Sequence, residues 1–355
     1  MKKKNCVSDL NACPVSSTPP HARHTIELYD ETELQELIRS IKGAADQDFG
    51  LAQDEVRRLA VLEGLAKGVM GPRRELLVGD IAMVERLESL KNTSPSFSAV
   101  IDVIRREACA SMQTKAPMRL TPMILLGPPG YGKTRIIRRL ATVLDTPSVS
   151  VSMNMCDDIC GELIGHSRSW RAARQGSISC ALLENDCAAP VVVIDEIEKA
   201  MRQGRDESPP NEIWLSLFEP ENARVFKDAF IGLTLRAEHI IYLATANSLR
   251  GIPTPVLDRA LVLSINAPEG DECITLARSV FRAFAADRPG LEGDLDLAAY
   301  EILARHTPRA MLKLLLLASG FAADRRSLRI EAGDIRDAES IVQARGEPAR
   351  RYGFI

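Results

Sequence analysis

The chain has 355 residues, of which 45% are hydrophobic and 26% are charged, which is the composition of an ordinary globular protein with room for two or three domains. Its 45 Lys and Arg residues against 48 Asp and Glu residues give a net charge of -3, which excludes the global basic field of many nucleic-acid-binding proteins. No apolar run is long enough to cross a bilayer or to act as a signal sequence, and the eight cysteines form no C-x-x-C pair, so we expect a cytoplasmic protein with free thiols and no membrane contact.

The N-terminal part is expected to be a polar lead-in followed by a small helical region. Residues 1–24 are polar and contain three prolines, a composition typical of disorder. Residues 25–95 then carry apolar side chains at helical spacing, and Thr32 with Gln35 forms a capping-box pattern at the first helix. The helical stretches are 34–41, 56–65 and 81–90. Their pattern predicts helices but indicates no function.

Residues 96–267 alternate helical patterns with short apolar, β-favouring runs. A helix over about 97–108 comes first, and five apolar runs follow it. These runs are 122–126, 148–153, 191–194, 240–244 and 261–265. We therefore expect an α/β domain in which a five-stranded parallel sheet is covered by helices on both faces.

Beyond residue 267 the strand pattern ends and only helical patterns remain. They cover 273–284, 297–304, 309–322 and 333–344. A smaller all-helical domain is expected over 268–344, and residues 345–355 are expected to form a tail.

A glycine-rich loop follows the first apolar run and precedes a helical pattern. Gly127–Thr134 reads G-x-x-x-x-G-K-T, and in this strand–loop–helix context the backbone N–H groups and the helix N-terminus face one set of phosphates. Lys133 is expected to reach the β- and γ-phosphates, and the Thr134 hydroxyl to bind Mg²⁺. The residues expected at the nucleotide are Gly127, Pro128, Pro129, Gly130, Tyr131, Gly132, Lys133, Thr134 and Arg135. The alternative is a turn that only joins a strand to a helix, but every position of the pattern is filled, which favours a nucleoside triphosphate site.

Two carboxylates end the third apolar run. Asp195 and Glu196 directly follow residues 191–194, and ligands bind at the carboxyl ends of parallel strands. Asp195 is expected to hold Mg²⁺, and Glu196 to orient or deprotonate the attacking water. The alternative is a strand that runs into a solvated acidic helix start, because Glu198 and Lys199 follow. Downstream of a complete phosphate-binding loop, the pair favours hydrolysis over binding alone.

These elements together resemble a known ATPase superfamily. The Gly127–Thr134 loop, the Asp195-Glu196 pair and the strand ending in Ala244–Ser248 resemble the Walker A, Walker B and sensor-1 elements of AAA+ ATPases. Three further segments are similar, in order and approximate spacing, to the ATPase module of Lon proteases. They are Gly165–Trp170, Phe218–Asn222 and Ile252–Arg259. The resemblance covers about residues 97–343 and implies that the helical domain after the sheet is the AAA+ lid.

The resemblance implies roles for three more polar residues. Asn247 would be the sensor that helps to position the attacking water, Arg259 the finger offered to the γ-phosphate of a neighbouring subunit, and Arg309 the sensor-2 arginine of the lid. Cations beside the transferred phosphoryl group stabilise its transition-state charge. Each residue also has an ordinary interpretation: Asn247 as a turn cap, Arg259 as the surface partner of Asp258, and Arg309 as a solvated residue of a helix start.

The resemblance also implies that Trp170 is a pore-loop aromatic that grips an extended polypeptide in a hexameric ring. A flat aromatic side chain offers a large contact area at a small entropic cost. The alternative is a core tryptophan, but the neighbouring residues are too polar for a core element. The residues after it, Arg171 and Ala172, depart from the small residues usual there, and the nearby arginines would suit an acidic or phosphate-bearing substrate.

The expected function is that of an ATPase that carries no protease domain of its own. A Lon-type peptidase carries a Ser/Lys dyad in a domain after the lid, and only residues 345–355 follow it here. We therefore expect an ATP- and Mg²⁺-dependent homo-oligomer, a hexameric ring by resemblance, that remodels or unfolds protein clients. A nucleic-acid motor or loader is a second possibility, less favoured by the net charge and by the lack of a helix-turn-helix pattern. A third is an ATP-dependent switch that translocates nothing.

Overall fold

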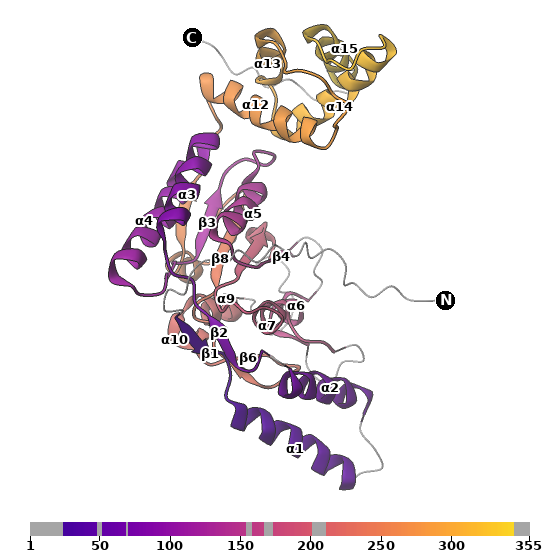
Figure 1. Ribbon diagram of the computed structural model, residues 1–355. Helices are drawn as coiled ribbons and strands as arrows, with labels where there is room; N and C mark the ends of the chain where they lie inside the picture. The colour runs from indigo at the N-terminus through magenta and orange to yellow at the C-terminus, as the bar shows by residue number, and fades with distance from the viewer. Residues whose placement is uncertain are drawn as a thin grey trace.

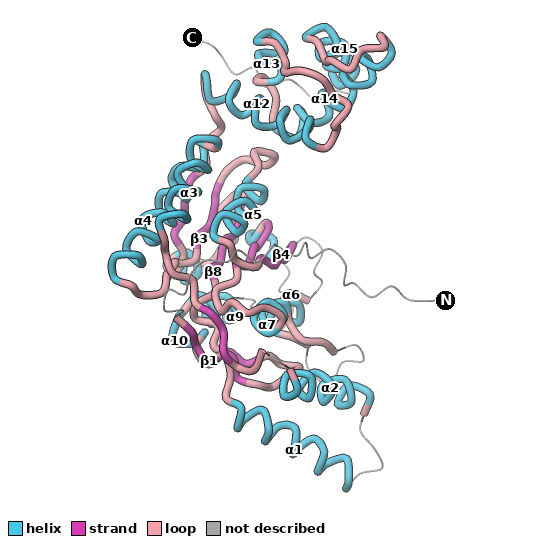
Figure 2. Tube along the Cα trace, viewed as in Figure 1, coloured by secondary structure: helices cyan, strands magenta, loops and turns pink. Residues whose placement is uncertain are grey.

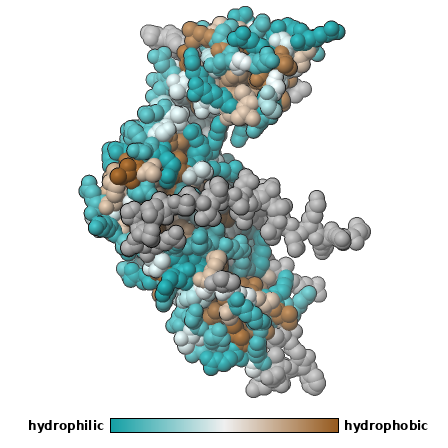
Figure 3. Space-filling view, viewed as in Figure 1, coloured by the Kyte–Doolittle hydropathy of each residue, from teal (hydrophilic) through white to brown (hydrophobic). Residues whose placement is uncertain are grey.

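The computed structural model describes residues 24–47, 52–68, 70–153, 158–166, 173–200 and 211–343. Figure 1 shows a helical pair, α1 and α2, at one end, a central sheet with its covering helices, and a helical domain, α12–α15, at the other end. Figure 2 shows that the strands are confined to the middle of the molecule and to the region beside α1 and α2. The face seen in Figure 3 is mostly hydrophilic, with scattered hydrophobic residues.

The central sheet contains the five predicted strands. They are β3 (Met123–Leu126), β4 (Ser148–Ser152), β5 (Val191–Asp195), β8 (Ile241–Ala246) and β9 (Leu261–Ser264). Their order is β4-β5-β8-β3-β9 and every neighbouring pair is parallel. The register places Leu126 opposite Ala246 and Ile194 opposite Ala244. The carboxyl ends of β3, β5 and β8 therefore meet at one edge of the sheet.

The inner strands β3, β5 and β8 are buried on both faces, which explains why they are apolar runs without alternation, whereas the edge strand β4 alternates Ser and Val. Val191 and Val193 pack with α3 (Ile81–Thr93), α4 (Ser98–Thr114) and α5 (Lys133–Leu144). Val192 and Ile194, which point the other way along the same strand, belong to a second hydrophobic cluster on the opposite face. The prediction of an α/β fold with helices on both faces is confirmed.

The N-terminal helices share their core with the sheet. The elements here are β1 (Thr25–Glu27), α1 (Glu31–Gln47), α2 (Gln53–Lys67) and β2 (Arg73–Glu75), and β1 pairs antiparallel with β2. Leu28, Leu34 and Leu62 are buried in the same cluster as Val192 of β5. The N-terminal helices therefore pack directly against the sheet, although the prediction placed a domain boundary between them at residue 95. One local prediction is wrong: the helix cap is Asp30, whose Oδ1 accepts from the backbone N–H of Thr32 at 2.7 Å.

Short elements connect the strands of the sheet. They are α6 (Ile159–Ile164), α7 (Ser177–Leu183), α8 (Ile197–Ala200), α9 (Asn211–Phe218), α10 (Pro220–Ala223), β6 (Phe226–Lys227), β7 (Thr234–Leu235) and α11 (Thr254–Leu257), and the 3₁₀ turn Pro95–Phe97 joins α3 to α4. The strands β6 and β7 form a small antiparallel hairpin. Strands of two or three residues leave no periodicity to read in a sequence, so these were not predicted.

Four helices follow the sheet and bury a core of their own. They are α12 (Asp271–Ala286), α13 (Leu297–Leu303), α14 (Pro308–Asp324) and α15 (Ala332–Gln343). Tyr300 and Leu314 lie in a hydrophobic cluster formed only by residues of this domain, and the Thr307 hydroxyl caps α14 by accepting from the Ala310 N–H at 3.4 Å. The predicted helical domain after the sheet is confirmed. In the described ranges no helix is long and apolar enough to cross a membrane.

Candidate active site

The glycine-rich loop runs from the end of β3 to the start of α5, as predicted. Gly127 N–H donates to the Ala246 carbonyl at 3.1 Å, and a Cβ at Gly127 would lie 2.5 Å from the Ile265 carbonyl oxygen, so only glycine fits there. Gly130 and Gly132 have φ angles of 87° and 86°, in the left-handed region that side chains rarely adopt. The loop therefore curls tightly in front of the helix N-terminus, where orphan N–H groups favour anions.

Lys133 lies under this loop with all three of its donors engaged. Its side chain is 7% exposed, and its Nζ donates to the carbonyls of Gly127 at 2.7 Å and Pro128 at 2.9 Å and to Asn247 Oδ1 at 3.0 Å. Burial lowers the pKa of Lys133, and nearby carboxylates, Glu198 foremost, oppose that shift. The ammonium thus links the loop after β3 to the residue that follows β8.

Asp195 and Thr134 form an oxygen pair that fits a magnesium ion. Asp195 Oδ1 accepts from Thr134 Oγ1 at 2.7 Å and from the Thr245 hydroxyl at 2.6 Å. Mg²⁺ in nucleotide sites takes one or two protein oxygens and completes its shell with phosphates and water. The described residues hold no group of three or more His, Cys, Asp or Glu that could bind a metal, so the ion would need the nucleotide for most of its ligands.

Glu196 is held in an unusual backbone conformation at the end of β5. Its φ is 59°, which is costly for a residue with a side chain, and its N–H donates to Thr245 Oγ1 at 3.0 Å. Its carboxylate accepts from Asn247 Nδ2 at 3.3 Å and pairs with Lys199 Nζ at 2.7 Å. The strained turn and these partners fix the direction of the carboxylate.

Sequence reasoning assigned Glu198 no role and mentioned it only in the alternative interpretation, a solvated acidic helix start. The residue is 5% exposed, and its Oε1 accepts from the backbone N–H of Asn247 at 3.1 Å. Its Oε2 is buried and has no hydrogen-bond partner among the described residues. Glu196 and Glu198 therefore both hold Asn247, one through its side-chain amide and the other through its backbone N–H. In the sequence, its position two residues after Glu196 is the feature that could have indicated that Glu198 belongs to the site.

The predictions for Arg259, Arg309 and Trp170 have different outcomes. Arg259 does not pair with Asp258: its Nε bonds Glu219 Oε2 at 2.7 Å, and the side chain stays 37% exposed. Arg309 is exposed in the first turn of α14. Trp170 lies outside the described residues. The tryptophan that is described, Trp214, is fully buried in the core.

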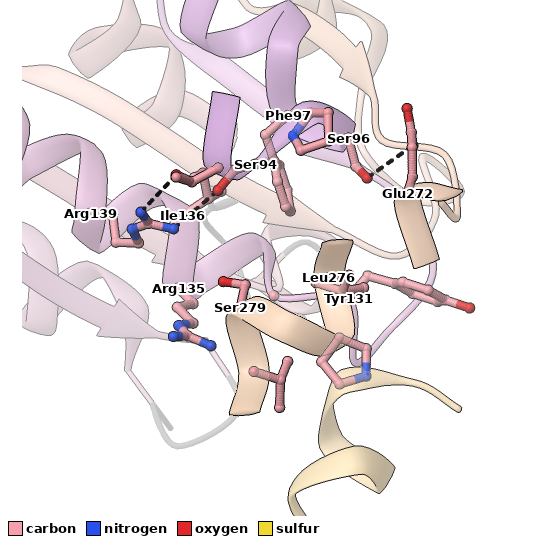
Figure 4. Close-up of a pocket in the computed structure, with 15 residues that line it drawn as sticks. Ser94, Ser96, Phe97, Tyr131, Arg135, Ile136, Arg139, Glu272, Leu276 and Ser279 are labelled. Carbon is pink, nitrogen blue, oxygen red and sulfur yellow. Dashed lines mark hydrogen bonds between the residues drawn. The ribbon is translucent and has the colours of Figure 1, made fainter. Parts of the chain in front are cut away.

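The start of α14 lies close to the glycine-rich loop. A Cβ at Gly130 would be 3.8 Å from Thr307, and a cavity beside the loop is lined by Tyr131 and Pro308. Phe97 and Leu276 add apolar surface to the same cavity (Figure 4). The structure thus brings the loop, the carboxylates and Asn247 together, and the lid adjoins them through Thr307.

Comparison with known proteins agrees with this geometry. Residues 123–265 match the model of the ATPase family associated with various cellular activities (AAA). The chain is 30% identical over 228 residues to the Lon protease of Frankia alni, an alignment that covers 60% of the chain and 26% of that protein. It is 27% identical over 257 residues to the peroxisomal Lon protease homolog 2 of Eremothecium gossypii, covering 71% and 24% respectively.

The chain therefore spans about a quarter of the length of these relatives. Among solved structures it is similar to a mutant RuvB of Thermotoga maritima, with a TM-score of 0.47 and 18% identity over 72% of this chain and 69% of that one. The predicted resemblance to AAA ATPases and to Lon proteases is confirmed.

Proposed function

We propose that this chain, which carries an AAA ATPase domain and resembles Lon proteases, binds ATP at Gly127–Thr134 and hydrolyses it at the carboxyl edge of its sheet. One observation carries the proposal: Lys133, Asn247 and Glu196 form a continuous hydrogen-bonded chain directly below the glycine-rich loop. A cation for the phosphates, a polar group and a carboxylate base are the components that phosphoryl transfer to water requires.

The residues divide the chemistry among them. The carboxylate of Glu196 orients a water and takes its proton as the water oxygen attacks the γ-phosphorus and the bond to the β-phosphate oxygen breaks. Through its side-chain amide, Asn247 fixes the position of that carboxylate relative to the Lys133 ammonium. Lys133 supplies positive charge to the β- and γ-phosphates. Mg²⁺, bound by Thr134 and Asp195, would neutralise charge on the phosphate oxygens.

The adenosine moiety is proposed to occupy the cavity beside the loop. Phe97, Tyr131 and Leu276 give that cavity an apolar lining, which suits a purine ring. The exposed Arg309 of the lid would reach the phosphates as the lid closes over the loop.

The active form is proposed to be a homo-oligomeric ring, six-membered by resemblance to AAA+ ATPases. Arg259 is partly exposed and anchored by Glu219, which supports its role as a finger for the phosphates of a neighbouring subunit. Trp170 is proposed as the residue that grips a protein client. The domain limits 25–95, 96–267 and 268–344 and the cytoplasmic location belong to the same proposal.

The decisive experiment compares the ATPase rate alone and with three additions: an unfolded protein, single-stranded DNA and duplex DNA. Stimulation by the unfolded protein alone supports a protein remodeller, whereas stimulation by DNA alone would replace it with a nucleic-acid motor. An ATPase that none of them stimulates would favour a switch. Lys133→Ala serves as the control for contaminating ATPase.

A further inference from the structure

A second, larger cavity lies beside the first, between α5 of the sheet domain and α12 of the lid. It measures about 590 Å³, and its lining includes four arginines and no carboxylate. We call these residues the arginine cluster: Arg135, Arg139, Arg278 and Arg282. Two come from α5 and two from α12, each pair at i, i+4 spacing, so each helix presents both side chains on one face.

Neutral groups hold two of these guanidinium groups in place. Arg139 donates to Ser94 Oγ at 3.0 Å and to Thr93 Oγ1 at 3.1 Å, as Figure 4 shows for Ser94. The guanidinium of Arg278 lies 5.0 Å from the centroid of the Tyr300 ring. Hydroxyl groups and an aromatic face position a cation without neutralising it.

The positive charge of the cluster is uncompensated in the described part of the chain. None of its four members forms an ion pair with a described carboxylate, whereas Arg325, in the same lid, pairs with Asp334 at 2.6 Å. The carboxylate of Asp294 accepts from the Tyr300 hydroxyl, and Glu272 lines the smaller cavity but not this one. Burial and the charge of Arg135 both lower the pKa of Arg139.

We propose that the arginine cluster binds a phosphate group distinct from the triphosphate at the glycine-rich loop. A phosphate monoester carries about two negative charges at neutral pH, and the guanidinium fork matches its oxygens in bidentate geometry. Because two arginines belong to α5 and two to α12, a bound phosphate joins the lid to the sheet domain.

The phosphate can come from two sources. The two cavities share Thr93, Arg135, Arg139 and Ser279, and Figure 4 shows Arg135 and Ser279 at the cavity beside the loop. A nucleotide seated in the smaller cavity could therefore extend a second phosphate, carried on its ribose, into the cluster. A free inorganic phosphate or pyrophosphate is the other source.

The test is calorimetric titration of pyrophosphate into the full-length chain carrying Lys133→Ala, which weakens competing binding at the glycine-rich loop. Adding Arg278→Gln and Arg282→Gln together should weaken pyrophosphate binding by at least about tenfold, because each charge-assisted contact contributes substantially to affinity. Arg305→Gln, an exposed lid arginine that lines neither cavity, is the matched control and should bind as its parent does. Melting curves verify that all variants are folded.

Unchanged pyrophosphate affinity in the double variant, or an equal loss in Arg305→Gln, overturns the proposal. Parallel titrations of adenosine 3′,5′-bisphosphate and AMP identify the source. A tighter fit of the bisphosphate that disappears in the double variant assigns the phosphate to the nucleotide, whereas pyrophosphate binding without that preference assigns it to a free anion. Binding of a single-stranded oligonucleotide but not of pyrophosphate would replace the site with a nucleic-acid contact. These titrations do not depend on ATP hydrolysis, so an inactive ATPase leaves their interpretation intact.

Discussion

Replacing Glu198 by alanine should slow ATP hydrolysis because this carboxylate positions Asn247. Its carboxylate accepts the backbone N–H of Asn247 at 3.1 Å, and Asn247 in turn joins Lys133 to Glu196. A hydrogen bond to a charged acceptor contributes about 1.5–3 kcal/mol. If that loss falls on the positioning of Asn247 in the transition state, kcat drops about ten- to hundredfold, because ~1.4 kcal/mol corresponds to a factor of ten.

The conservative variant separates positioning from simple loss of packing. Glu198→Gln keeps an oxygen that accepts from Asn247, at about half the strength of a charged acceptor, so kcat should fall only about fivefold. The KM for ATP should stay within about threefold in both variants, because Lys133 keeps its two loop carbonyls. Glu184→Gln, an exposed carboxylate, is the control.

Steady-state ATPase kinetics and melting curves provide the measurement. The reasoning is refuted if Glu198→Ala keeps the kcat of the parent, or if the variant loses ATP binding and thermal stability together, since that pattern describes a structural residue only.

Three further substitutions test the remaining roles. Lys133→Ala should lower kcat/KM for ATP by about two orders of magnitude or more, because the phosphates lose their cation, and equal turnover would contradict this. Arg259→Ala should abolish hydrolysis while each subunit still binds ATP, and mixing it with Lys133→Ala should restore some activity; a fully active monomer, or no recovery despite co-assembly, would count against a shared site. Trp170→Ala should keep the basal ATPase but lose its stimulation by a protein client, whereas Trp170→Tyr should keep both; a midpoint many degrees below that of the parent, with basal ATPase lowered too, would identify a core residue instead.

The predictable parts of this protein are those in which local sequence determines the structure. The inner strands of the central sheet are mostly apolar runs of four to six residues, and the phosphate-binding pattern of the glycine-rich loop occupies eight consecutive positions. The cap of α1 was also readable, because Asp30 directly precedes the helix. The capping-box pattern was given too much weight.

Other features depend on contacts between distant residues. Glu198 lies among charged neighbours in sequence, and its burial results from Asn247, which is 49 residues away. The partner of Arg259 lies 40 residues away, on Glu219, so the adjacent Asp258 was the natural but incorrect alternative. The arginine cluster likewise combines residues of α5 with residues of α12, and no local pattern indicates that the two helices meet.

Hydrolysis at the carboxyl edge of the sheet is tested most directly by single-turnover kinetics of Glu196→Gln. Glutamine keeps the shape of the side chain and the bond from Asn247 but removes the proton acceptor. The variant should bind Mg²⁺-ATP with an affinity close to that of the parent and release phosphate at least about a hundredfold more slowly. Phosphate release at the parental rate, or loss of ATP binding in a folded variant, would contradict the assignment of Glu196 as the base.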